Sequence, residues 1–141
     1  MPVDPFVSQF FHLSEVTCHC GCGLAPHEEF LIKLDSLRNA LGRAVIPTSV
    51  VRCAAYNMKV SGTGTTGPHV PNPKYPDKGA IDFICHTGLA LDAVRNLPNI
   101  GWYRYGLAQS QKLPPEKRWI HVDNWTVAEG FPAPALWTYE P

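Results

Sequence analysis

Three short segments of the sequence contain side chains that could bind a metal ion. Gly67-Pro-His69 places a histidine on a glycine-rich loop, and Lys78-Gly-Ala-Ile-Asp82-Phe places a carboxylate within an apolar run. The third segment, Arg118-Trp-Ile-His121-Val-Asp123-Asn-Trp, alternates as a strand does. Two histidines and one carboxylate are a zinc ligand set that leaves a fourth position for water, as in catalytic zinc sites. We therefore predict that His69, Asp82 and His121 bind zinc.

The two strand-like segments also indicate how these side chains are placed. An unpaired charge inside an apolar strand is costly, so Asp82 must be hydrogen-bonded, neutralised or metal-bound. Taken singly, each residue has an ordinary explanation: a satisfied histidine, a strand-end cap at Asp82, a solvated carboxylate at Asp123. In the third segment, a period of two places one set of side chains on one face (Trp119, His121, Asp123, Trp125) and the others opposite (Ile120, Val122, Asn124).

Length and composition limit the classes of protein to consider. The 141 residues fit a single domain, and 45% of them are hydrophobic. Twelve basic and twelve acidic residues balance, so charge gives no reason to expect nucleic acid or an anionic membrane as partner. No apolar run approaches the roughly 20 residues of a membrane span. The N-terminus lacks the basic and apolar regions of a signal peptide. The odd number of cysteines suggests synthesis in a reducing cytoplasm.

The hydrophobic pattern predicts an α+β fold, with a small, mainly antiparallel sheet and flanking helices, over one domain, 1–141. The clearest helix spans 27–41, with two glutamates in its first turn and Gly42 at its end. An irregular arm, 1–17, and a Pro/Trp-rich tail, 126–141, flank the remaining elements. Those elements are strands over 44–51, 79–85, 100–105 and 119–125, helices over 53–60 and 89–97, and loops over 61–68, 70–78 and 106–118.

An ordered series of motifs covers about residues 10–125. It comprises Glu15…Cys18-His-Cys-Gly-Cys22, Ser49-Val-Val-Arg52-Cys53, Asn57-Met-Lys-Val60-Ser-Gly62, His69…Ala80-Ile-Asp82, and Trp102-Tyr103…His121-Val-Asp123. The series resembles the zinc D-alanyl-D-alanine carboxypeptidase superfamily, the LAS or hedgehog-type murein peptidases. The branch it resembles most is the small carboxypeptidase-like domain of phage endolysins and bacterial murein peptidases.

The resemblance implies a function for the predicted zinc site. It implies hydrolysis of a peptide bond involving D-amino acids in the peptidoglycan stem peptide. It also implies a monomer that reaches the cell wall after its release from the cell and that is phage-encoded in part of this branch. Arg52 corresponds to an arginine that holds the substrate carboxylate or the developing oxyanion; its ordinary role is a surface ion pair. Tyr103 and Trp125 are expected to line the cleft.

Two departures from the motifs concern the loop and the general base. Twelve residues separate His69 from Asp82, where the family has about six, and Lys78 replaces a motif glycine. The positions that hold an acid or base in several relatives are Arg118 and Trp119 here. We expect Asp123, about 7 Å along the strand from His121, to act as the base. The alternatives are Glu116 as the base, or Asp123 as a residue that orients a ligand histidine.

The cysteines at 18, 20 and 22 have a spacing tighter than the two to four residues usual in zinc knuckles. By resemblance we expect a structural role, either a packed turn or a disulfide to Cys53 after release. A structural zinc with His19 or His27 is the alternative. The enlarged loop and the unusual base position also leave a second function open, a catalytically silent cell-wall-binding or structural phage module of the same fold.

Overall fold

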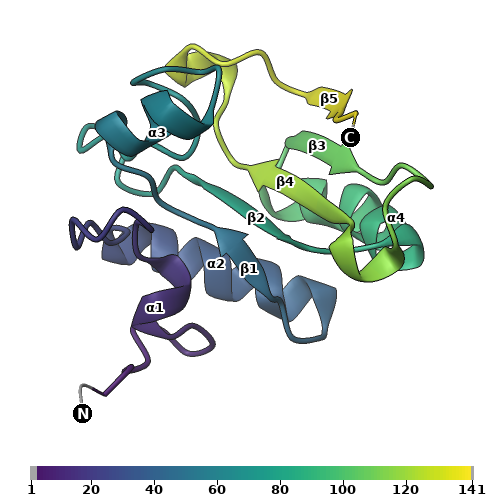
Figure 1. Ribbon diagram of the computed structural model, residues 1–141, viewed down its shortest axis with the longest axis horizontal. Coiled ribbons are helices and arrows are strands. Elements are labelled where there is room, and N and C mark those ends of the chain that lie inside the picture. The colour runs from purple at the N-terminus through teal and green to yellow at the C-terminus, as the bar shows by residue number, and fades with distance from the viewer. Residues whose placement is uncertain (1–2, 141) are drawn as a thin grey trace.

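A five-stranded sheet forms the centre of the protein in a computed structural model, which describes residues 3–140 (Figure 1). The order in the sheet is β1-β2-β4-β3-β5, and every neighbouring pair is antiparallel except β3 and β5, which are parallel. The predicted α+β class with a mainly antiparallel sheet is confirmed. The strands are β1 (Pro47–Ser49), β2 (Ala80–Ile84), β3 (Arg104–Ala108), β4 (Trp119–Asp123) and β5 (Ala135–Thr138).

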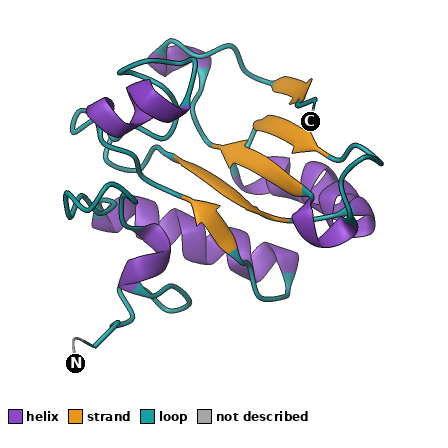
Figure 2. Ribbon diagram, viewed as in Figure 1, coloured by secondary structure: helices purple, strands orange, loops and turns teal. Residues whose placement is uncertain are grey.

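Helices flank this sheet (Figure 2). The longest, α2 (Glu28–Leu41), confirms the predicted helix and buries Phe30, Leu34 and Leu37. None of the helices in the described range is long and apolar enough to cross a membrane. The other helices are α1 (Leu13–Val16), α3 (Ala54–Val60) and α4 (Thr87–Asn96), and 3₁₀ turns occupy η1 (Leu97–Ile100), η2 (Pro115–Lys117) and η3 (Val127–Glu129).

The two central strands, β2 and β4, separate the core from the polar site. Ile81 and Phe83 on β2 and Ile120 and Val122 on β4 are fully buried in one core with residues of α2 and α4. Asp82 on β2 and Trp119 and His121 on β4 point to the opposite face, where they line a cavity, and this confirms the period of two. The site is therefore built on two adjacent strands whose other face is anchored by apolar packing.

Four elements differ from the sequence-based expectations. The first strand covers only 47–49 of the expected 44–51, and beyond it the backbone N–H of Arg52 donates to the carbonyl of His69 outside the sheet. The third strand begins at Arg104 rather than at residue 100, because residues 97–100 continue the chain as a 3₁₀ turn. The N-terminal arm contains α1, and the tail contributes η3 and β5. The tail therefore extends the sheet instead of remaining irregular.

Candidate metal centre

Strand pairing and one loop bring the three predicted ligands together. Asp82 on β2 lies directly opposite His121 on β4 in the antiparallel register. His69 comes from the loop after α3, and its carbonyl accepts a hydrogen bond of 3.0 Å from the Arg52 N–H. The twelve residues between His69 and Asp82 do not prevent this convergence, because all three side chains form one buried group.

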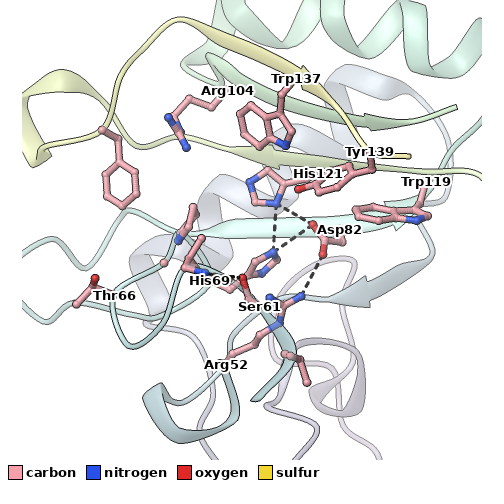
Figure 3. A pocket seen from close by; sticks show the side chains of 16 residues that line it. Arg52, Ser61, Thr66, His69, Asp82, Arg104, Trp119, His121, Trp137 and Tyr139 are labelled. Carbon is pink, nitrogen blue, oxygen red and sulfur yellow. Dashed lines mark hydrogen bonds and ion pairs between the residues drawn. The ribbon is translucent and has the colours of Figure 1, made fainter. Parts of the chain in front are cut away.

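The geometry of this group fits a small divalent cation. His69 Nε2 lies 3.1 Å from Asp82 Oδ1 and 3.2 Å from His121 Nδ1, and the latter two atoms are 2.8 Å apart. Nitrogen and oxygen ligands at about 2.0–2.1 Å from a tetrahedral zinc ion are separated by about 3.3 Å. An expansion of a few tenths of an ångström therefore accommodates the ion. Figure 3 shows the three side chains pointing toward one another.

Each histidine also has a partner on its other ring nitrogen. His69 Nδ1 lies 2.6 Å from the carbonyl of Val50, and His121 Nε2 lies 2.7 Å from Asp123 Oδ2. A carbonyl only accepts, so His69 carries a proton on Nδ1 and presents the lone pair of Nε2 to the group. The carboxylate fixes His121 in the same way, with Nδ1 facing the group. Such partners orient metal-binding histidines and increase their basicity.

Burial and mutual charge set the electrostatics of the metal-free group. Burial lowers the pKa of His69, and Asp82 offsets this only in part. Burial also opposes protonation of His121, but hydrogen bonds from its ring to Asp123 and Asp82 outweigh it and raise the pKa to about 9. Burial would raise the pKa of Asp82, yet the two histidines hold it well below its usual range. The site therefore combines an ionised carboxylate with a protonated histidine, whose proton a cation can replace.

Asp123 lies behind His121 rather than beside the three converging atoms. It contacts Nε2 of the imidazole, whereas Asp82 and His69 contact Nδ1 on the other side of the ring. Its carboxylate is fully buried and accepts from Arg104 Nε at 2.8 and 3.1 Å. This position argues against the expected role of general base and favours the alternative, in which Asp123 orients His121. Strand periodicity indicates that Asp123 and His121 lie on the same face of the sheet, but not which way the imidazole ring of His121 is turned.

Arg52 borders the group with part of its donor capacity unused. Its Nε donates to Ser49 Oγ at 3.0 Å, and its two terminal nitrogens donate to Asn57 Oδ1 at 3.2 Å and Asp82 Oδ2 at 3.3 Å. Three of the five N–H groups of a guanidinium are thus engaged, and two remain for a ligand. The buried Asn57 also donates to Thr63 Oγ1 at 2.9 Å, which links α3 to the glycine-rich loop. Arg52 therefore has structural bonds in addition to its place at the cavity.

A cavity of about 700 Å³ opens beside the three candidate ligands. Trp137 from β5 lies over His121, with ring centroids 5.4 Å apart (Figure 3). Gly106 on β3 allows this approach, because a Cβ there would lie 2.5 Å from Trp137 Nε1. The sequence did not indicate Trp137 or Tyr139, since the tail has no pattern that would place it at the site. It did not indicate Arg104 either, because that residue lies within an expected strand, 100–105, whose partner strands were unknown. The walls comprise Arg52, residues 60–63 and 66–69, Asp82, Arg104, Trp119, His121, Phe131, Trp137 and Tyr139.

Three residues expected near the site lie elsewhere. Tyr103 is 40% exposed and lines a separate hollow with residues of α4 and the tail, so the structure does not bring it to the cavity beside His121. Trp125 is buried beside Pro68, to whose carbonyl its indole N–H donates, and it lines a neighbouring hollow. Glu116 is exposed on η2 and does not line the cavity. The long loop, 70–78, also lies outside the cavity walls.

Comparisons of the chain with protein-family models, curated proteins and solved structures give no match.

Proposed function

We propose that this protein is a zinc-dependent peptidase that hydrolyses a peptide bond involving a D-amino acid in the peptidoglycan stem peptide. One observation carries the proposal: His69 Nε2, Asp82 Oδ1 and His121 Nδ1 converge within 3.2 Å of one another at the wall of a large cavity. The ordered motifs that resemble the murein peptidases support the substrate class. A zinc ion bound by these atoms would supply a Lewis acid and an activated water.

The side chains around the cavity suit a peptide with a free carboxylate. The two unused N–H groups of Arg52 can hold a carboxylate or a developing oxyanion in a planar fork. Burial raises the pKa of Tyr139, so its hydroxyl stays protonated at neutral pH and can donate a hydrogen bond to a substrate oxygen. The aromatic walls formed by Trp119, Trp137 and Phe131 exclude water from the bound peptide.

A second candidate is a binding module that retains the metal site without turnover. One specific observation favours it: among the cavity-lining residues within 3–140, Asp82 is the sole carboxylate, and it belongs to the ligand group. No free carboxylate of the described residues is therefore placed to accept a proton from water. The aromatic cavity and Arg52 would suffice to bind a stem peptide.

Mass spectrometry of muropeptides distinguishes the two candidates. Zinc-loaded protein is incubated with purified peptidoglycan, and the released and residual stem peptides are identified. We expect stem peptides that have lost a terminal D-amino acid or a cross-link, with no change when His121→Ala is used as the matched control. Unchanged muropeptides, together with co-sedimentation of the protein with peptidoglycan, would contradict the peptidase proposal and support the binding module.

A further inference from the structure

A second group of potential metal ligands lies where the N-terminal segment meets the start of α3. The Sγ atoms of Cys18, Cys20, Cys22 and Cys53 all lie within 4.8 Å of one another. Cys20 Sγ is 3.5 Å from Cys18 Sγ and 3.6 Å from Cys53 Sγ. Four sulfurs bound tetrahedrally at about 2.3 Å from one zinc ion are about 3.8 Å apart. The arrangement therefore matches a four-thiolate site.

The backbone of residues 18–24 explains how closely spaced cysteines can converge. The N–H of Cys18 donates to the carbonyl of Leu24 at 2.9 Å, which closes the segment into a loop. Gly21 and Gly23 have φ of +86° and +81°, in the left-handed region that other residues rarely adopt. These two turns direct neighbouring side chains toward one point. Although the single-residue spacing is tighter than that of a zinc knuckle, the cysteines can therefore bind the same metal ion.

Hydrogen bonds to sulfur give the cluster a further property of metal-binding cysteines. The N–H of Cys53 donates to Cys18 Sγ at 3.3 Å, and the N–H of Tyr56 donates to Cys53 Sγ at 3.4 Å. Donors of this kind favour the thiolate form, which is the form that binds metal. All five cysteines of the chain are free thiols in this structure, and the disulfide to Cys53 expected after release stays a prediction. His19 and His27 do not belong to the group, so neither expected histidine ligand is placed there.

We propose that Cys18, Cys20, Cys22 and Cys53 bind one zinc ion in a closed structural site that is distinct from the group around His121. Four thiolates fill a tetrahedral coordination shell and leave no position for water, so the site is structural rather than catalytic. It joins the N-terminal loop to Cys53, the residue after Arg52. Zinc there would fix the backbone from which Arg52 reaches Asp82.

Metal analysis and cobalt spectroscopy of the whole chain, purified under reducing conditions, test this site. We expect two zinc ions per chain, one for each group. The double variant Cys20→Ser with Cys22→Ser should lose one ion, and His121→Ala should lose the other. His19→Ala, a change within the same loop but outside the group, should keep both. Cobalt-loaded wild type should show thiolate-to-cobalt charge-transfer absorption, which His121→Ala retains and the double cysteine variant lacks.

These readouts do not depend on peptidase activity, so failure of the proposed function leaves them intact. The single variant Cys22→Ser covers the case in which the double variant does not fold; its charge-transfer band should weaken and shift. The proposal is overturned if cobalt-loaded wild type lacks that absorption while all five thiols react freely with a thiol reagent. A disulfide between two of the four cysteines that persists under these reducing conditions, with no zinc bound there, would equally overturn it.

Discussion

Replacing Asp123 with asparagine separates two effects of one buried carboxylate. Asp123→Asn keeps the shape and can still accept a hydrogen bond from His121, but it removes the negative charge beside Arg104. Arg104 is 7% exposed, and its Nε donates to both carboxylate oxygens. Removing one partner of a buried ion pair costs about 3–5 kcal/mol, because the remaining charge stays desolvated. We expect a loss of this size in the free energy of unfolding, measured by urea denaturation of the metal-free protein.

The same substitution should also weaken zinc binding. A partner on the far nitrogen of a metal-binding histidine typically contributes about 10–100-fold to metal affinity. The double variant Asp123→Asn with Arg104→Gln is the matched control, since it removes both charges. It should recover the part of the lost stability that comes from the unpaired Arg104 charge, while zinc affinity, measured by competition with a chromogenic chelator, stays reduced.

Two results would refute this reasoning. A single variant within about 1 kcal/mol of wild type would show that the Arg104 pair is not buried as described. Unchanged zinc affinity combined with a turnover loss of about 10²–10⁴-fold would show that Asp123 is the general base after all.

Three further changes test other parts of the site. Arg52→Ala should lower turnover by about 100-fold. It should also lower the free energy of unfolding by about 1–3 kcal/mol, because Asn57 and Ser49 lose their hydrogen-bond donor. Kinetics and urea denaturation measure the two effects, and unchanged values would contradict both the substrate-binding and the structural role of Arg52. Gly106→Ala should displace Trp137 from above the site and cost about 1–3 kcal/mol, visible in tryptophan fluorescence and melting; an unchanged spectrum and stability would argue against the close approach. In metal-free protein the pKa of His121 is about 9, against about 6.5 in the unfolded chain. Its protonation therefore stabilises the fold fully below pH 6.5, and about 3 kcal/mol of the free energy of unfolding is lost as the pH rises through 9. Urea denaturation in the presence of a chelator measures this, and a free energy of unfolding that stays constant across that pH range would contradict the buried ion pairs.

The positions of two candidate ligands, Asp82 and His121, could be predicted because local sequence patterns determine them. A charged residue inside the apolar run around Asp82 and the alternation around His121 indicated two strands with polar residues on one face. When these two strands pair in the antiparallel orientation, Asp82 and His121 lie opposite each other on that polar face. The helix over 28–41 was equally clear, because its apolar spacing and its terminal glycine agree.

The rest of the site depends on contacts between distant segments. Trp137 reaches the cavity because β5 pairs in parallel with β3, and nothing in the Pro/Trp-rich tail indicates that partner. The face of Asp123 follows from periodicity, but which nitrogen of His121 it meets depends on the ring orientation fixed by the group as a whole. Cys53 joins the other cysteines across an interval of 35 residues from Cys18, which spacing alone does not reveal.

Anomalous diffraction at the zinc absorption edge tests most directly whether these side chains form a metal centre. Crystals of the zinc-loaded protein should show a peak about 2.0–2.2 Å from His69 Nε2, Asp82 Oδ1 and His121 Nδ1. The imidazole of His121 should keep its contact with Asp123 through Nε2. No peak between these three atoms, or zinc bound by Asp123 and Nε2 on the far side of the ring, would contradict the assignment of the metal centre.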